Sequence, residues 1–560
     1  MVREDARAQW LRRLLIAGFF AALLPLLPGE LRYHGDERFY TDGALQMLRS
    51  GDYLTPRAAD GSPRFLKPGL SYWLIAAAYQ AFGIGLATSR LPALLAGAGT
   101  LWLAGRAVLA LGGSESASFL AVAILASNMS LLLVAVRSTP DALLCLFLAA
   151  SSVGFLRLIV REDRRPGAYA LAWLGAGLAV AAKGLLGLLP VLFSLLFCAL
   201  GRRLGAPSPR ALVHLPAMAA GAAIGFFWFG AVLLEHGAAA WAGFFADQIG
   251  GKVESSGLRA VGNVPRYVLS ALQHFLPWSA LAALAWVAGR RDAPPGDRQG
   301  RLTLLYTLGI FSTMLAIFAA GRDLRPRYLL PAYPLIAIAL APWLERRFGA
   351  AGARRPARLL QGAVAIIGIG GGAVIAASGW VLDRRIAAAG LLLAAASALV
   401  AAAARRGWRH AVAGTALLLI FTLPLFDLLV SPVFSVQPAR LAAERIAALE
   451  PVPARVGVVG LGGEFAGLLS LRLEGRVAVT KEEALPPAGA ASLPPVLVAT
   501  APYREELLAR GYLLEPCGFL QRRWTARDIR RALGEGGVAL RLRNTRIPVY
   551  LATGSGPGAS

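Results

Sequence analysis

The sequence predicts an all-α protein that crosses a membrane many times and carries a smaller α/β domain at its C-terminal end. Hydrophobic residues make up 56% of the 560 residues and charged residues only 16%, whereas soluble globular chains are about 45–50% apolar and about 25% charged. The mean hydropathy is +0.57, and apolar runs recur from the N-terminus to about residue 432. This composition excludes a disordered chain, a fibrous protein and an ordinary cytosolic enzyme.

Thirteen apolar runs approach the length of about 20 residues that a membrane-spanning helix needs. They cover residues 14–30, 88–110, 117–136, 141–160, 167–181, 184–200, 210–234, 264–289, 303–320, 327–343, 359–380, 386–404 and 410–431. The segment 69–84 is shorter and contains Tyr72, Trp73 and Tyr79, residue types that gather at the membrane–water boundary. We therefore expect it to be an interfacial or re-entrant helix, and we expect the first run to be a retained helix.

The net charge of +25 is explained by topology better than by nucleic-acid binding, since most arginines lie in short loops between apolar runs. With the N-terminus in the cytoplasm, 24 arginines fall in loops on the cytoplasmic side and seven basic residues in short loops on the other side. An excess of Lys and Arg in cytoplasmic loops is the general rule. The long loops 31–87 and 235–263 and the C-terminal segment are thus predicted to lie on the outer side of the membrane.

The chain divides into a predicted membrane domain, residues 1–432, and a predicted α/β domain on the outer side, residues 433–560, which the family resemblance described below implies to be periplasmic. The second part mixes a helical pattern, PARLAAERIAALE, with the strand-like runs ARVGVVGL, RVAVT and PVLVAT. Two of the three cysteines, Cys145 and Cys198, fall in apolar runs, so no disulfide framework is expected. No spacing of His and Cys residues suggests a bound metal, and no cofactor is expected.

Five polar stretches map to the predicted outer face, whereas the middles of the apolar runs are almost free of charge. They are GDERFY (35–40), RFLKPGLSYW (64–73), STPD (138–141), AAKGLLGLLP (181–190) and GRDLRPRYLLPAYP (321–334). Carboxylates at such a face can supply a general base, and lysine and arginine can hold a phosphate. Each stretch also has a structural explanation that needs no function. Acidic residues are favoured at helix starts, and an interfacial lysine can extend its ammonium group to water.

Taken together and in this order, these stretches resemble the GT-C membrane glycosyltransferases. The similarity is closest to the bacterial family of the aminoarabinose lipid A transferase and relatives of the protein O-mannosyltransferases. It is carried by DERFY (36–40), QMLRSGDYLTP (46–56), the F-x-K-P-x-x-x-Y-W pattern at 65–73, and RPRYLLP (325–331). Leu66 and Gln248 replace a glutamate and a histidine that are associated with zinc in the aminoarabinose enzyme, so no zinc is expected.

The resemblance implies a thirteen-span fold and an inverting, metal-independent transfer of a sugar from a polyprenyl-phosphate donor to a periplasmic acceptor such as lipid A. Asp36 would be the base or would orient the acceptor. The expected catalytic residues are Asp36, Glu37 and Asp141, and the expected donor-phosphate residues are Lys67, Lys183, Arg327, Tyr328, Arg38 and Tyr40. The expected partners are the lipid-linked sugar, a lipid or glycan acceptor and membrane lipids.

Two other functions remain open from the sequence. One is transfer of the sugar to a protein or to another glycan or lipid, which would use the same donor chemistry. The other is transport of a lipid-linked sugar, which predicts ionisable residues in the middle of spans because a conduit runs through the bilayer. The near absence of such residues favours an enzyme with its site at the membrane edge.

Overall fold

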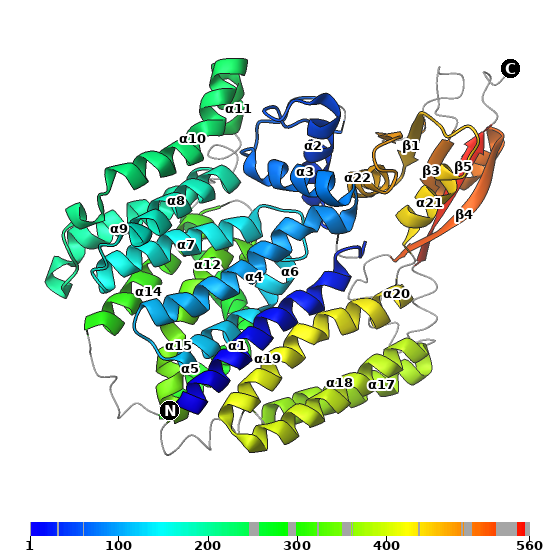
Figure 1. Ribbon diagram of the computed structural model, residues 1–560. Coiled ribbons are helices and arrows are strands. Elements are labelled where there is room, and N and C mark those ends of the chain that lie inside the picture. Colours follow the sequence, from blue (N-terminus) through cyan, green and yellow to red (C-terminus); the bar gives the residue numbers. More distant parts are fainter. Residues whose placement is uncertain are drawn as a thin grey trace.

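A computed structural model of the chain shows an inclined bundle of helices with a small sheet beside one end (Figure 1). It describes residues 2–30, 33–59, 61–245, 257–288, 298–321, 324–349, 360, 362–434, 437–482, 485, 496–521 and 546–554. The bundle contains α1 (Val2–Leu23), α4 (Leu86–Ala110), α5 (Glu115–Ala126), α6 (Met129–Val134), α7 (Asp141–Val160), α8 (Pro166–Lys183), α9 (Leu189–Leu200), α10 (Leu215–His236), α11 (Ala238–Phe245), α12 (Gly257–His274), α13 (Trp278–Ala288), α14 (Arg298–Ala319), α15 (Tyr333–Gly349), α17 (Gly371–Leu382), α18 (Arg384–Ala403), α19 (Trp408–Leu425) and α20 (Ser431–Phe434).

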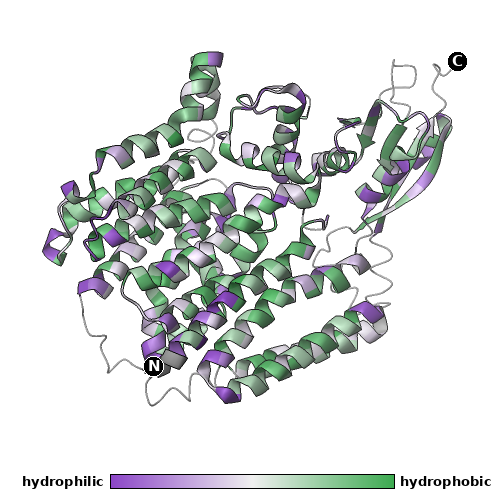
Figure 2. Cartoon of the chain, in the orientation of Figure 1, coloured by the Kyte–Doolittle hydropathy of each residue, from purple (hydrophilic) through white to green (hydrophobic). Residues whose placement is uncertain are grey.

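The chain is a multi-pass membrane protein by the length and composition of its helices. Among the described residues, nine helices are long and apolar enough to cross a membrane, or ten if one bent pair counts as a span. Hydrophobic residues predominate along the helices of the bundle, and many hydrophilic residues lie toward helix ends (Figure 2). The all-α membrane fold is thus confirmed, whereas the number of thirteen spans stays a prediction.

Two predicted spans are interrupted in the structure. The run 117–136 forms α5 and α6, because the Asn128 side chain accepts hydrogen bonds from the N–H groups of Ser130 (3.1 Å) and Leu131 (3.2 Å) and so starts a new helix. The run 264–289 forms α12 and α13, which meet at 99°. The two breaks are in contact, since Asn128 Nδ2 donates to the His274 carbonyl (3.0 Å) and Trp278 Nε1 donates to Ser127 Oγ (2.9 Å).

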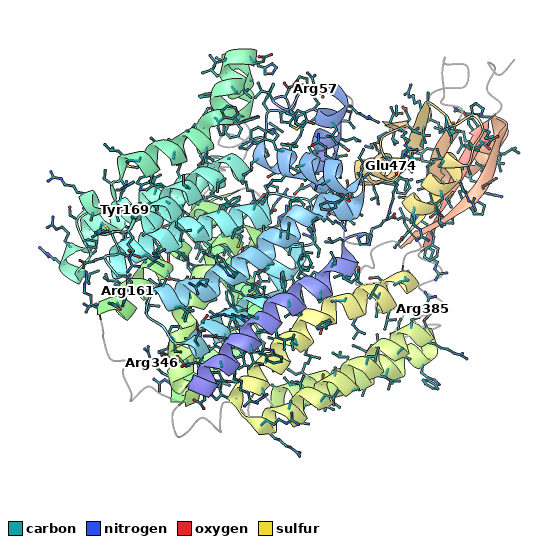
Figure 3. The ribbon with its side chains drawn as sticks, in the orientation of Figure 1. Arg57, Arg161, Tyr169, Arg346, Arg385 and Glu474 are labelled. Carbon is teal, nitrogen blue, oxygen red and sulfur yellow. The ribbon has the colours of Figure 1, made fainter. Side chains whose placement is uncertain are left out.

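The first long loop forms two helices at one end of the bundle, α2 (Glu37–Ser50) and α3 (Leu70–Phe82). With 13 residues, α3 is too short to span a bilayer, which needs about 20 residues. This agrees with the short helix expected over 69–84, while its depth in the membrane stays a prediction. Arg161 and Arg346 lie at the opposite end of the bundle, as the loop assignment requires, while Arg57, Arg385 and Glu474 lie at the end with α2 (Figure 3).

Helix α8 packs closely between α7 and α10 because glycines remove side chains from both contacts. A Cβ atom at Gly177 would collide with the carbonyl of Gly221, and one at Gly154 would collide with the backbone of Ala172. Small residues that let helix backbones approach are typical of membrane bundles. This packing fixes the position of Lys183, the last residue of α8.

We expect Gly177→Val to lower the free energy of unfolding by about 1–3 kcal/mol, the usual range for forcing atoms into a packed interior. Gly230→Val is the matched control, since a Cβ atom at Gly230 would meet no atom within 4 Å. Thermal unfolding of both purified variants measures the difference. Equal stability of the two variants would contradict the close α8–α10 contact.

The C-terminal part contains a five-stranded sheet in the order β2-β1-β3-β5-β4, which confirms a small α/β unit. The strands are β1 (Arg455–Val459), β2 (Ala478–Glu482), β3 (Val496–Thr500), β4 (Tyr512–Gln521) and β5 (Arg546–Gly554); the helices are α21 (Pro438–Ala447), α22 (Gly463–Arg472) and α23 (Arg504–Ala509). Strand β1 pairs in parallel with β2 and β3, and β5 pairs antiparallel with β3 and β4.

Helix α22 packs between the sheet and α2 of the first long loop (Figure 1). Arg472 Nε donates to Glu30 Oε1 (2.8 Å) and Arg472 Nη2 donates to the Pro28 carbonyl (3.0 Å) just beyond α1. A Cβ atom at Gly467 would lie 2.8 Å from Arg38 Cβ, and one at Gly475 would lie 2.6 Å from Leu45 Cδ2. The sheet domain therefore rests directly on α2.

Candidate active site

A buried ion pair anchors the first turn of α2. The side chains of Glu37 and Arg90 are both 0% exposed, and Arg90 donates two hydrogen bonds to the Glu37 carboxylate, at 2.8 and 3.0 Å. The same carboxylate accepts from the backbone N–H groups of His34 (2.8 Å) and Ser138 (2.9 Å). Glu37 thus ties α2, α4 and the segment before α7 together, and none of its surface is open to a substrate.

Asp36 immediately precedes α2 and faces two arginines from a distant part of the chain. Its Oδ2 accepts hydrogen bonds from Arg327 Nη2 and from Arg325 Nη1, the latter at 3.3 Å. The Asp36 side chain is about one third exposed. The structure therefore joins two of the five polar stretches that the sequence singles out.

Asp141 and Lys183 bring two further stretches to the same place. Asp141 starts α7, and its carboxylate accepts from Lys183 Nζ and from Thr139 Oγ1 (3.1 Å). Arg327 Nε lies 3.9 Å from Asp141 Oδ2. Lys183 can end α8 here because Gly184 follows it with φ +91°, a conformation that favours glycine. Arg327 thus stands between the carboxylates of Asp36 and Asp141.

The aromatic ring of Tyr328 makes cation–π contacts with Lys183 and Arg327. Lys183 Nζ lies 4.7 Å and Arg327 Cζ 5.9 Å from the ring centroid, and Phe318 packs beside the ring at 5.1 Å. Tyr328 belongs to η6, a short 3₁₀ helix over Pro326–Ala332. The hydroxyl of Tyr267 accepts a hydrogen bond from the Arg325 N–H (3.1 Å), which holds the entry of this helix.

Lys67 and Tyr40 belong to segments packed beside this group. Lys67 follows Phe65, whose ring packs on Trp228 at 6.5 Å, and precedes Ser71, whose Oγ donates to the Ala182 carbonyl at 3.3 Å. The start of α3, which follows the Lys67 loop, therefore contacts the end of α8. Tyr40 packs on Tyr72 with ring centroids 5.3 Å apart, and burial, followed by the nearby Tyr72 and Asp141, raises the pKa of Tyr40 well above its usual value.

Arg38 faces a different direction from the other predicted phosphate residues. Its guanidinium lies 4.5 Å from the centre of the Phe39 ring, and Arg64 lies 4.0 Å from the same ring. Its side chain also lies against Gly463 and Gly467 of α22. These contacts associate Arg38 with the sheet domain rather than with Lys183 and Arg327.

Arg137 is a further cation of the site that the sequence interpretation did not select. Burial lowers its pKa, and so does the neighbouring Arg327, while Glu37 and Asp141 act in the opposite direction. In the described part of the chain, the buried Nε atoms of Arg137 and Arg327 have no hydrogen-bond partner. Two adjacent guanidinium groups with unused N–H donors are suited to an anion. The sequence did offer a signal for Arg137: it is an arginine in a predicted outer loop, whereas basic residues generally concentrate in cytoplasmic loops.

The whole cluster has an excess of positive charge, since Arg137, Lys183, Arg325 and Arg327 surround the carboxylates of Asp36 and Asp141. Within the described ranges, no three His, Cys, Asp or Glu side chains gather as they would around a metal ion. Gln248, Lys252 and Arg322, which the sequence placed in outer loops, lie outside the described residues. The arrangement can bind a phosphate and hold carboxylates beside it.

The chain is similar to known proteins in both sequence and fold. Residues 25–231 match the family model described as dolichyl-phosphate-mannose-protein mannosyltransferase. The chain is superposable on two crystal structures of ArnT from Cupriavidus metallidurans, one bound to undecaprenyl phosphate and one in the apo state. Their TM-scores are 0.68 and 0.67, each at 19% identity, and the bound structure covers 96% of this chain and 97% of its own. The chain has the ArnT fold.

Relatives by sequence agree with the ArnT fold and confirm the predicted resemblance. The undecaprenyl phosphate-alpha-4-amino-4-deoxy-L-arabinose arabinosyl transferase of Edwardsiella ictaluri is 28% identical over 394 residues, covering 64% of this chain and 65% of the relative. The enzyme of the same name from Yersinia enterocolitica is 26% identical over 338 residues, covering 59% of this chain and 58% of the relative. The chain thus aligns with about three fifths of the length of these curated relatives.

Proposed function

We propose that this protein is an integral inner-membrane glycosyltransferase that transfers a sugar from an undecaprenyl-phosphate-linked donor to an acceptor at the periplasmic face. The observation that carries the proposal is the cluster of four cations around Asp36 and Asp141 at one end of the bundle. The ArnT fold supports it, because a structure with that fold is bound to undecaprenyl phosphate.

The cations would hold the phosphate of the donor. Arg137, Arg327 and Lys183 would bind it directly, Lys67 would approach it from the loop before α3, and the Tyr328 and Tyr40 rings would enclose it. As the bond between the sugar and the phosphate breaks, negative charge grows on the departing phosphate. Fixed cations aimed at that charge stabilise the transition state without reorganising, so the protein itself can supply this stabilisation with no metal ion.

The carboxylates would act on the other side of the sugar. A single displacement at the anomeric carbon inverts its configuration and needs the acceptor oxygen opposite the leaving phosphate. Asp36 would act as the base or would orient the acceptor, and Asp141 would hold Lys183 and Arg327 in position. Glu37 would position the first turn of α2 through Arg90, since its carboxylate is fully enclosed.

Two acceptors fit this chemistry, and each has its own support. The curated relatives are named for the transfer of arabinose from undecaprenyl phosphate-alpha-4-amino-4-deoxy-L-arabinose, which agrees with the resemblance to the lipid A transferase family and its lipid acceptor. The family model that matches residues 25–231 describes protein mannosyltransferases, which favours a protein hydroxyl. The matched region contains Asp36, Lys67, Asp141 and Lys183.

The proposal is tested by sugar transfer with the purified full chain in lipid nanodiscs. Undecaprenyl phosphate carrying radiolabelled 4-amino-4-deoxyarabinose or mannose is supplied with lipopolysaccharide or with periplasmic protein. Label in lipid A or in protein that depends on the chain supports the transferase and identifies the acceptor class. Uptake of labelled donor into sealed vesicles with no transfer to any acceptor would contradict it and favour a transporter.

We expect Lys67→Ala to weaken binding of undecaprenyl phosphate tenfold or more, since a hydrogen bond to a charged group contributes about 1.5–3 kcal/mol. Lys481→Ala is the matched control, because Lys481 is exposed on β2 of the sheet domain. Equilibrium binding to nanodisc-embedded protein measures both variants. Equal affinity of the two variants would remove Lys67 from the phosphate site.

A further inference from the structure

His34 is held at the centre of the site by contacts on its backbone and on its ring. Its N–H donates to the buried Glu37 carboxylate (2.8 Å). Its ring Nδ1 lies 3.1 Å from the Asp36 backbone nitrogen, and its Nε2 lies 3.0 Å from Arg327 Nη1. The side chain is about one third exposed, so a substrate can reach it.

These ring contacts favour a neutral imidazole. The Asp36 N–H and the Arg327 guanidinium can only donate, and a neutral imidazole has one nitrogen lone pair that can accept while imidazolium has none. Only one of the two contacts is therefore a hydrogen bond at a time, and protonation would remove both. Burial lowers the pKa of His34, as do Arg327 and Arg137, against the opposing influence of Asp36 and Glu37.

The donor phosphate would change what the ring faces. Arg327 is the residue that contacts Nε2, and it is also a proposed ligand of the donor phosphate. In the tautomer that carries its proton on Nδ1, the lone pair is on Nε2. When Arg327 donates to a phosphate oxygen instead, this lone pair becomes available to the acceptor. Asp36 Oδ2 lies 3.6 Å from Nδ1, where a carboxylate stabilises the imidazolium that forms when the ring takes a proton, as in histidine–aspartate pairs of other enzymes.

We propose that His34 is the catalytic base that takes the proton from an acceptor hydroxyl, with Asp36 as its positioning residue. The inference rests on the proposed transferase function and specifies its acceptor. The acceptor oxygen forms a bond to the anomeric carbon as the carbon–oxygen bond to the phosphate breaks. The electron pair of that bond leaves with the phosphate, and the acceptor proton moves to His34 Nε2.

The acceptor class follows from this assignment. A hydroxyl group needs a base in the transition state, whereas a phosphate acceptor is already ionised and needs none. Both nearby carboxylates are occupied by cations, Asp36 by Arg325 and Arg327 and Asp141 by Lys183. Unlike these carboxylates, the neutral imidazole is not held in an ion pair with a cation, so it is the group placed to take a proton, and the acceptor we infer is a sugar, lipid or protein hydroxyl.

The test uses His34→Gln, in which the amide oxygen can still accept from the Asp36 N–H but cannot act as a base. Transfer from radiolabelled undecaprenyl-phosphate sugar and binding of undecaprenyl phosphate are measured in nanodiscs from pH 5 to pH 8. We expect a loss of transfer of at least about a hundredfold, with phosphate affinity within about threefold of the original at pH 8. In His34→Ala, whose short side chain leaves room for the ring, added imidazole should restore part of the activity.

The pH profile separates a base from a structural residue. In the unchanged protein, kcat/KM should fall as the pH drops through the pKa of His34, which lies below its usual 6.5. The His34→Gln variant should lose this acidic limb, and His410→Gln, whose side chain bonds to Arg7 near the other end of the bundle, should keep it.

Transfer by His34→Gln within about threefold of the original, with the same acidic limb, would overturn the base assignment while leaving the transferase function intact. A parallel loss of transfer and of phosphate affinity would also overturn it, in favour of a structural role. If the unchanged protein itself transferred no sugar, the proposed function would fail and this inference with it.

Discussion

Replacing Glu37 by leucine is expected to lower the free energy of unfolding by about 3–5 kcal/mol. The change leaves the fully enclosed guanidinium of Arg90 without its carboxylate, and an uncompensated buried charge costs about this much. It also leaves the N–H groups of His34 and Ser138 without an acceptor. Thermal and denaturant unfolding of the detergent-solubilised protein measures the loss.

The double variant Glu37→Leu, Arg90→Leu tests whether the charge is the cause. It removes both members of the pair, so it should lose clearly less than the sum of the two single variants. Glu444→Leu is the control for breaking an ion pair at the surface, because Arg440 and Glu444 are both more than half exposed, and it should cost within about 1 kcal/mol. A Glu37→Leu protein as stable as Glu444→Leu would show that the pair is not an anchor.

Arg327→Gln is expected to reduce sugar transfer about a thousandfold. The change removes a charge-assisted hydrogen bond to Asp36, a charge beside Asp141 and a proposed contact to the donor phosphate. Two hydrogen bonds to charged groups at about 1.5–3 kcal/mol each correspond to two to four powers of ten in rate. Initial rates with saturating and limiting donor separate the effect on kcat from that on KM.

The matched control is Arg346→Gln, at the opposite end of the bundle from the site (Figure 3). It removes the same charge and should leave transfer within about twofold. If Arg327→Gln transferred sugar as fast as Arg346→Gln, Arg327 would not belong to the site. A higher KM with unchanged kcat would restrict Arg327 to binding the donor equally in the ground and transition states.

The sequence predicts the membrane fold well because a bilayer imposes a strong and local constraint. Long apolar runs must be helical to satisfy their backbone hydrogen bonds, and this constraint reveals helices such as α4, α7 and α18 without any knowledge of packing. The interruptions are harder to predict. The break at Asn128 depends on a side chain that competes for backbone N–H groups, and its partner across the bundle, His274, is 146 residues away.

The same distinction applies to the site. Charged residues in outer loops are visible in the sequence, and Asp36, Asp141, Lys183 and Arg327 do meet in the structure. Their individual contacts depend on tertiary approach. Glu37 is adjacent to Asp36 in the chain but faces Arg90, and Arg38 turns toward α22. The helical period separates these neighbours by about 100° each, so adjacency in the chain does not predict a common role.

The seam between α2 and α22 has a consequence for engineering this protein. Arg38 and Leu45 of α2 press against Gly467 and Gly475, where a larger residue would collide. A chimera that takes its sheet domain from another member of the fold would have to import a compatible α2 as well. Helix α2 begins immediately after Asp36. Exchanging the sheet domain without a matching α2 would therefore shift the first turn of α2 and, with it, the side chains of His34 and Asp36.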